Sequence, residues 1–109
     1  MGQIIINITV PVVPSSRKFI HHIYAGVGSA VPEITKYFKK DFARMTKELS
    51  TKITEKIKPG SYVKGQIILE YDDNTKKPLR IFTKELIIYD FGTIYNYPII
   101  VENNKIDSS

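Results

Sequence analysis

Two adjacent histidines, His21 and His22, come closest to a catalytic grouping in this chain. Because an imidazole exchanges protons near neutral pH and the neighbouring Arg17 and Lys18 are cationic, a phosphodiesterase or nuclease is one hypothesis for this segment. On a strand, however, consecutive side chains point to opposite faces, so the two rings would not serve one centre. No paired carboxylate and no second histidine at metal-ligand spacing accompanies them. We therefore assign no catalytic residue and favour a protein that is not an enzyme.

Metal and cofactor chemistry has little support in the sequence. The chain contains no cysteine, which excludes disulfides, zinc ribbons, iron–sulfur clusters and cysteine nucleophiles. Gly26 and Gly28 precede a predicted helix, but they lack the lysine of a phosphate-binding loop and the third glycine of a dinucleotide fingerprint. Asp72 and Asp73 lack the downstream glutamate of a calcium loop and are interpreted as turn residues. We predict neither a metal nor a cofactor.

Positive charge is concentrated in one segment. The formal net charge of the chain is +5, and residues 33–58 contain eight Lys or Arg against four Asp or Glu, a net charge of +4. On a helix, Lys36, Lys40, Lys47 and Lys58 would lie within about 40° of one another and form a basic ridge. Such a ridge favours contact with nucleic-acid phosphates. The residues that we assign to nucleic-acid binding are Arg17, Lys18, Lys36, Lys40, Arg44 and Lys47.

The alternative is an ordinary solvated helix face. Three acid–base pairs at helical spacing would neutralise several charges along this helix, namely Asp41–Arg44, Glu48–Lys52 and Glu55–Lys58. The ridge also offers Lys and Thr side chains in place of the Arg, Asn and Gln side chains that bind base edges. We therefore expect DNA or RNA to be bound with little sequence preference.

Aromatic residues around Gly92 form a second candidate surface. These residues are Tyr89, Phe91, Tyr95 and Tyr97. Tyrosine gives a large contact area at low entropic cost, so it is frequent in protein interfaces, and exposed aromatic rings also stack on unpaired bases. Cross-strand pairing within a hairpin is the structural alternative. The second functional hypothesis is a protein-interaction or accessory module that binds a host protein, and the many Ile, Lys, Tyr and Asn residues favour an AT-rich genome such as that of a virus, a plasmid or a thermophile.

The elements that position these residues begin with a strand. Residues 3–13 are rich in β-branched side chains that alternate along the chain, and Pro11 limits the strand because it has no N–H to donate. Residues 17–25 fit either a second strand or a short helix closed by Gly26. We favour the strand.

The strongest periodic pattern predicts one long amphipathic helix from Pro32 to Lys58. Its apolar residues recur at spacings of three and four, and they are Ile34, Phe38, Phe42, Met45, Leu49, Ile53 and Ile57. Pro32 suits the first turn of a helix, and Pro59 and Gly60 end it. At 1.5 Å per residue this helix would be roughly 40 Å long, which is longer than a small sheet needs.

After residue 60 the period changes to two, which predicts strands. A hairpin is expected from residues 61–71 and 79–91, with the polar residues 72–78 as its turn and Gly65 as a bulge. A last strand follows over residues 94–102, and its proline marks it as an edge. The fold class predicted is α+β, with a mainly antiparallel sheet of four to five strands packed against one long helix.

A second copy of the chain is the expected partner. Large apolar residues fall on both parities of residues 79–91, which we interpret as a sheet covered on both faces. One helix layer covers only one face, so a homodimer is predicted to bury the other.

The chain is expected to be one domain over residues 1–102 with a flexible tail over 103–109. No apolar stretch approaches the roughly 20 residues of a membrane-spanning helix, and the N-terminal apolar residues lack the basic flank of a signal peptide. We therefore expect no membrane contact and a soluble protein located in the cytoplasm.

Overall fold

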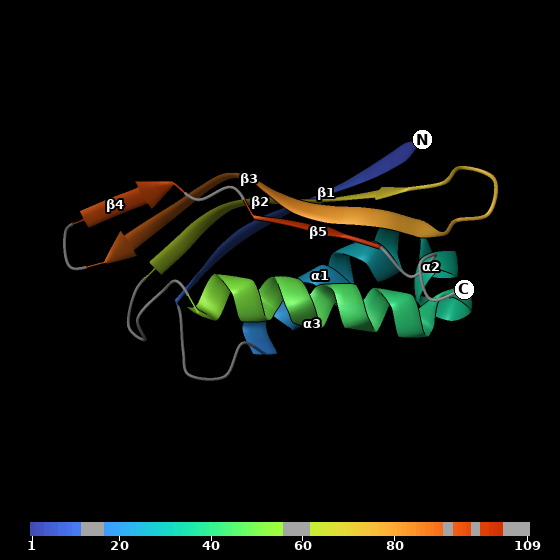
Figure 1. The fold of residues 1–109 in the computed structure, drawn as a ribbon, viewed down its shortest axis with the longest axis horizontal. Helices are drawn as coiled ribbons and strands as arrows, with labels where there is room; N and C mark the ends of the chain where they lie inside the picture. The colour runs from blue at the N-terminus through green and yellow to red at the C-terminus, as the bar shows by residue number, and fades with distance from the viewer. Residues whose placement is uncertain (12–16, 56–61, 91–92, 97–98, 104–109) are drawn as a thin grey trace.

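The computed structural model describes residues 1–11, 17–55, 62–90, 93–96 and 99–103, which form five strands and three helices (Figure 1). In chain order these are β1 (Gly2–Pro11), α1 (Arg17–Ala30), α2 (Pro32–Tyr37), α3 (Lys39–Glu55), β2 (Tyr62–Tyr71), β3 (Pro78–Asp90), β4 (Thr93–Asn96) and β5 (Ile100–Glu102). The strands form one antiparallel sheet and the helices lie on one of its faces. The predicted α+β class is confirmed, with the 17-residue α3 as the main helix on the sheet.

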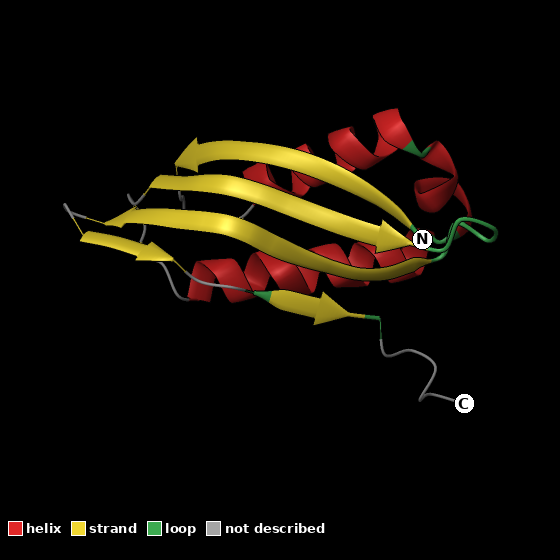
Figure 2. Cartoon of the chain, turned by 90° about the horizontal axis from the view of Figure 1, so that it is seen from above, coloured by secondary structure: helices red, strands yellow, loops and turns green. Residues whose placement is uncertain are grey.

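The sheet follows the order β1-β2-β3-β4, and β5 pairs with another part of β3 (Figure 2). The predicted turn of the β2–β3 hairpin is confirmed: the Asp72 carboxylate accepts hydrogen bonds from the backbone N–H groups of Asn74 and Thr75 at 2.8 and 3.0 Å. These backbone hydrogen bonds lower the pKa of the Asp72 carboxyl below its ordinary value. The turn is therefore held by its own first residue.

The predicted bulge lies opposite Gly65. The register between β2 and β3 shifts here, because β3 contains one extra residue. Glu85 in the bulge has a left-handed φ of 55°. A Cβ on Gly65 would lie 2.8 Å from the Leu86 Cα and 2.9 Å from the Glu85 carbonyl oxygen. Only glycine leaves room for the opposite backbone at this position.

The bulge also changes which residues of β3 face the helices. Ile81 and Thr83 are buried before it and Leu86 is buried after it, so the inward positions change from odd to even numbers. Leu86 is therefore apolar because it faces the same helix layer as Ile81. The prediction that apolar residues on both parities of this strand indicate two covered faces is wrong for Leu86. Phe82 lies on the face away from the helices, where it is half-buried. The homodimer itself stays a prediction.

The single last strand predicted over residues 94–102 is instead two strands, β4 and β5. β4 pairs with residues 87–90 and β5 with residues 80–82, on either side of the bulge in β3. Between these pairings, the Ile99 N–H donates to the Thr83 hydroxyl and the Thr83 N–H donates to the Ile99 carbonyl, both at 2.9 Å. The interruption follows from the bulge, because one regular strand cannot match both halves of β3.

Helix α1 replaces the strand that the sequence interpretation favoured for residues 17–25. A segment this short fits both the helical period and the strand period. In the structure, Ile23 and Val27 are buried four residues apart, which is the helical spacing. Gly26 does not end α1. A Cβ there would lie 2.8 Å from Ile6 Cγ1, so this glycine allows α1 to pack closely on β1.

The long helix predicted from Pro32 to Lys58 is divided at Phe38. The φ of −123° and ψ of 39° at Phe38 are not helical, so α2 ends before it and α3 begins after it. The apolar spacing continues through the break because Ile34 of α2 and Phe42 of α3 are both fully buried in the same core. The turn keeps α2 beside the end of α1 (Figure 1). Residues 56–58 lie outside the described residues.

One core lies between the sheet and the helix layer. It consists of Ile4, Ile6, Ile8, Ile23, Val27, Ile34, Phe42, Met45, Leu49, Ile53, Val63, Ile67, Leu69, Ile81, Leu86, Ile99 and Val101. The rings of Tyr24 and Phe42, with centroids 4.8 Å apart, join α1 to α3 within this layer. The helices thus turn their apolar sides to the sheet, and α3 also buries the polar residues Asp41, Thr46 and Ser50.

Candidate nucleic-acid interface

The cationic residues predicted on one helix are divided between α2 and α3. Lys36 lies in the last turn of α2, whereas Lys40, Arg44 and Lys47 follow one another along α3. All four are exposed. The break at Phe38 separates Lys36 from the residues on α3. The prediction that Lys36 and Lys40 align on one continuous helix is therefore wrong. Lys39, which the sequence interpretation did not assign, is also exposed at the start of α3.

Arg44 is bound within the fold. Its guanidinium donates a hydrogen bond of 2.6 Å to the Asn103 side-chain oxygen and lies 3.7 Å from the Asp41 carboxylate. The Asn103 amide in turn donates to the Pro78 carbonyl at 2.9 Å and to Asp41 at 3.5 Å. Arg44 therefore links α3 to the start of β3 and the end of β5. Asn103, the first residue of the predicted tail, takes part in this link.

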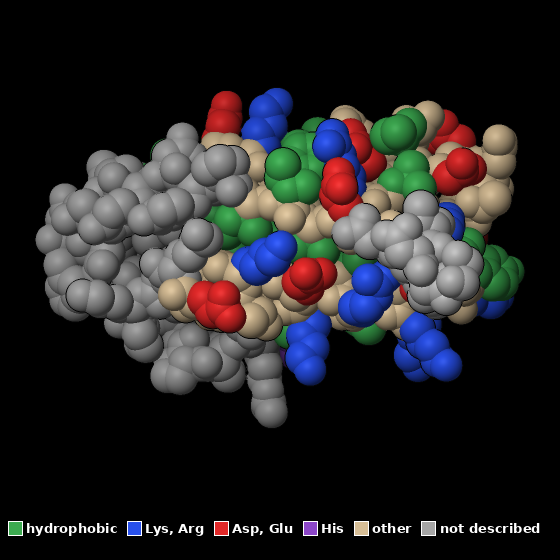
Figure 3. All heavy atoms as spheres, in the orientation of Figure 1, with side chains coloured by type: hydrophobic (Ala, Val, Ile, Leu, Met, Phe, Trp, Pro, Cys, Tyr) green, Lys and Arg blue, Asp and Glu red, His purple; other side chains and the backbone are tan. Residues whose placement is uncertain are grey.

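Four lysines of α2 and α3 form what we call the lysine surface: Lys36, Lys39, Lys40 and Lys47. Among the described residues, none of their ammonium groups has a carboxylate within 4.0 Å. The predicted pair Glu48–Lys52 is present at 3.8 Å, which takes Lys52 out of this surface. Figure 3 shows Lys and Arg side chains protruding from the lower margin of the molecule, beside α3. Of the cations on α3, Arg44 and Lys52 are thus paired with carboxylates, whereas the ridge residues Lys40 and Lys47 have no carboxylate partner among the described residues.

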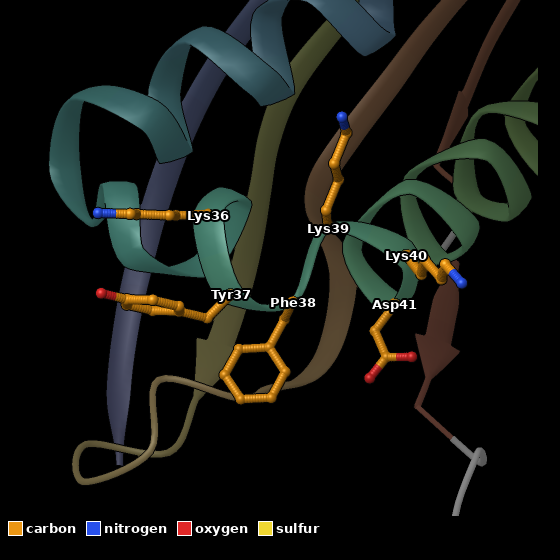
Figure 4. Close-up of a pocket in the computed structure, with 6 residues that line it drawn as sticks. All are labelled: Lys36, Tyr37, Phe38, Lys39, Lys40 and Asp41. Carbon is orange, nitrogen blue, oxygen red and sulfur yellow. The ribbon is translucent and has the colours of Figure 1, made fainter.

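A hollow of about 300 Å³ lies at the break between α2 and α3. Its lining residues are Lys36, Tyr37, Phe38, Lys39, Lys40 and Asp41. Figure 4 shows Lys36 and Tyr37 projecting to one side, while Lys39 and Lys40 point in two other directions. The Lys36 ammonium lies 5.4 Å from the centroid of the Tyr37 ring. Diverging ammonium groups suit an extended polyanion better than a single small anion.

His21 and His22 are consecutive residues of α1, and His21 lines a hollow with Ile20, Tyr24 and Ala25. Both imidazole side chains are exposed there. The described residues contain no group of three or more His, Cys, Asp or Glu that could hold a metal ion. Arg17 and Lys18 begin α1, but their side chains lie outside the described part, and their assignment to nucleic-acid binding stays a prediction.

The aromatic group around residue 92 is only partly described. Tyr89 lies in β3 and Tyr95 in β4, and the two are not opposite one another in the strand register. Phe91 and Tyr97 lie outside the described residues, as do the side chains of all four aromatic residues. The proposed interface at these positions therefore stays a prediction.

A polar cluster that the sequence interpretation missed lies on the open face of the sheet, away from the helices. Glu70 is only 8% exposed; it accepts a hydrogen bond from the Gln3 amide at 3.0 Å and another from the Arg80 guanidinium. The hydrogen bond from Arg80, followed by that from Gln3, lowers the pKa of the Glu70 carboxyl. The signal available in the sequence was the hairpin itself, because Glu70 and Arg80 are paired across its turn.

One transverse row of apolar residues crosses the same open face. In register from β1 to β5 these are Ile5, Ile68, Phe82 and Ile100. Ile5 is 56% exposed and Ile100 is 51% exposed at the two ends, whereas Ile68 is buried. The Arg80 guanidinium lies 4.8 Å from the Phe82 ring centroid and shields part of it from water.

The lysine surface and the open face of the sheet are the two features of the described structure that suggest a function. No described helix is long and apolar enough to cross a membrane. Comparison with family models, with curated proteins and with solved structures finds no match to this chain.

Proposed function

We propose that this protein binds DNA or RNA without catalysing a reaction on it, through the lysine surface of α2 and α3 and with little sequence preference. The observation that supports this proposal most directly is that four exposed ammonium groups on consecutive helices have no carboxylate partner among the described residues. When unpaired cations contact nucleic-acid phosphates, the counterions condensed on the nucleic acid are released, and this release drives binding.

The chemistry of these side chains supports low sequence preference. An ammonium group acts as a point charge on a flexible stem and contacts phosphate without fixing a base edge, whereas a guanidinium forms the paired hydrogen bonds that distinguish bases. The one guanidinium of α3, that of Arg44, is already bound to Asn103 and Asp41. The lysine surface therefore provides positive charge for phosphate contacts but no group that distinguishes one base from another.

Charge reversal tests the proposal with a matched control. The double variant Lys40→Glu, Lys47→Glu alters the lysine surface, and the control Lys64→Glu, Lys84→Glu makes the same change in net charge at two exposed lysines of the sheet. At low salt we expect the first variant to lose roughly 100-fold in affinity for a duplex oligonucleotide, since two phosphate contacts disappear. The control should lose much less. Equal losses in the two variants would show that net charge, and not this surface, determines binding.

A second candidate function is association of two copies through the open sheet face. The specific observation is that both ends of the apolar row, Ile5 and Ile100, are more than half exposed. A neighbouring row contains Gln3, Glu70, Arg80 and Glu102 in register. A two-fold axis along the strands, between β2 and β3, places Ile5 over Ile100 of the second copy.

The same axis makes the charges of the two copies complementary. It brings Glu70 of one copy opposite Arg80 of the other, and each apolar row covers the other. Stacked sheets lie about 10 Å apart with their strands nearly aligned, which this arrangement satisfies. We infer a second copy as the occupant because the face is complementary to itself. A host protein, as expected for an accessory module of a virus or mobile element, is the alternative partner.

Cross-linking tests this arrangement, helped by the absence of cysteine from the chain. In one copy, residues 5 and 100 are three strands apart, about 14 Å, whereas across the proposed interface they face each other about 10 Å apart. A thiol cross-linker of about 10 Å reach should therefore give a covalent dimer from the double variant Ile5→Cys, Ile100→Cys. Neither single variant should be linked. Dimers from the single variants, or none from the double variant, would contradict the arrangement.

A further inference from the structure

Tyr37 is an exposed aromatic residue among the lysines at the end of α2. The residue is 65% exposed, although the neighbouring Phe38 is half-buried and Ile34 is fully buried. Leaving an aromatic ring of this size in water forgoes the free energy that its burial would provide. The ring is thus available to a ligand, and it lies outside the apolar stripe that packs on the sheet.

The surroundings of Tyr37 are cationic and hollow. The Lys36 ammonium lies 5.4 Å from the ring centroid, and Lys39 and Lys40 follow directly after the break. These residues line the hollow of about 300 Å³ between the two helices (Figure 4). Asp41 also lines the hollow, but it is buried and bonded to Asn103 and Arg44. Figure 4 shows its carboxylate well away from Tyr37, so it does not oppose an anion beside the ring.

An aromatic ring beside cations is the combination that binds single-stranded nucleic acid. Every base has a flat face that can stack on such a ring, while the cations contact the phosphates on either side. In a duplex both faces of each internal base are already stacked, so the ring could not be used. A surface built only for charge would need the lysines but would gain nothing from Tyr37.

We propose that the α2–α3 break binds single-stranded nucleic acid, with the Tyr37 ring stacked on an unpaired base and Lys36, Lys39 and Lys40 at the flanking phosphates. This inference rests on the proposed function, because the same lysines carry both. It adds a ligand class, since it makes unpaired bases preferred over a duplex. Binding stays independent of base identity, because stacking reads no hydrogen-bonding edge.

The test compares an oligothymidylate with an abasic oligonucleotide of the same length and charge, and with a duplex of half that length, whose two strands together carry the same total charge. The wild-type protein should bind the oligothymidylate more tightly than the other two. Tyr37→Leu should lower affinity for the oligothymidylate by roughly 5- to 150-fold, the range measured for one base stacked on a ring. Affinity for the abasic probe should not change, because that probe has no base to stack.

Tyr37→Phe is the conservative control. It keeps the ring and should retain the oligothymidylate affinity, and circular dichroism checks that both variants are folded. An oligouridylate probe in parallel shows whether RNA is bound in the same way.

The inference is overturned if the wild-type protein binds the duplex as tightly as the oligothymidylate. Two results with Tyr37→Leu also overturn it, and they are distinct from failure of the proposed function. If Tyr37→Leu binds the oligothymidylate as tightly as the wild type does, Tyr37 does not stack on a base. If Tyr37→Leu lowers the affinities for the oligothymidylate and for the abasic probe equally, its effect does not come from base stacking. In both cases the charge-based proposal is unaffected, whereas a wild-type protein that binds none of the three probes overturns the proposed function and the inference together.

Discussion

At position 65 the backbone of the opposite strand determines the residue. The Cβ of any other residue would lie 2.8 Å from the Leu86 Cα, and a backbone atom cannot move aside as the end of a side chain can. Gly28 on α1 is the opposite case, because a Cβ there would meet nothing within 4 Å. The two glycines therefore differ in what they contribute to folding.

Replacing each glycine by alanine should change stability in opposite directions. Gly65→Ala should lower the free energy of unfolding by about 2 kcal/mol, because the strand must shift to admit the methyl group. Gly28→Ala should raise it by about 0.5–1 kcal/mol, because alanine in a helix loses less conformational entropy on folding. Urea unfolding followed by circular dichroism measures both. A neutral Gly65→Ala would mean that the bulge is not as tight as described.

At the scale of elements, one link fastens α3 to the sheet edge. Arg44 donates to Asn103, whose backbone N–H donates to the Leu79 carbonyl at 2.9 Å and whose amide donates to the Pro78 carbonyl. The sequence interpretation assigned Arg44 to nucleic-acid binding. Its contacts give it a structural role that Lys47, one turn further along α3, does not have among the described residues.

Truncating these two residues should separate their roles. Arg44→Ala should lower the free energy of unfolding by about 1 kcal/mol, the typical value of a lost hydrogen bond with a charged partner that is partly in water. Lys47→Ala should stay within about 0.5 kcal/mol of the wild type, as exposed substitutions generally do. Denaturation in urea tests both variants. If Arg44→Ala were as neutral as Lys47→Ala, the link would carry no stability.

The elements that the sequence predicts well are those with long, regular patterns. The stripe of α3 and the alternation of β1 and β2 are such patterns, and a polar turn with Gly65 predicts the hairpin and its bulge. The break at Phe38 is not predictable from spacing, because Ile34 and Phe42 stay in one core on either side of it. Segment 17–25 is too short for its hydrophobic period to distinguish a helix from a strand, and its packing on β1 determines that it is a helix.

The candidate site is less predictable from the sequence than the fold. Exposed lysines can be recognised from a helical pattern, and the structure confirms that Lys40 and Lys47 lie on the exposed side of α3. Whether a cation is already paired depends on residues distant in the chain, as Asn103 is for Arg44. The sequence does not single out Tyr37, because its exposure depends on the break that places it at the end of α2.

At the scale of the whole molecule, the two candidate surfaces lie on opposite sides. The lysine surface belongs to the helix layer, and the apolar row with the Glu70 cluster belongs to the open face of the sheet (Figures 1 and 2). Two copies joined through their open faces would present one lysine surface on each outer side. Such a dimer could hold two segments of nucleic acid at once, and blocking dimer formation would leave binding by each copy intact.

The salt dependence of affinity tests the central claim most directly. Dissociation constants for a duplex oligonucleotide are measured from about 50 to 200 mM salt, for the wild type, for Lys40→Gln, Lys47→Gln and for the control Lys64→Gln, Lys84→Gln. If the lysine surface neutralises two to four phosphates, the logarithm of affinity falls linearly with that of salt, with a slope of roughly −2 to −4. The Lys40→Gln, Lys47→Gln variant should reduce the steepness by about two while the control keeps the wild-type slope. An affinity that does not change with salt, or a slope that the two lysines do not alter, would contradict nucleic-acid binding through this surface.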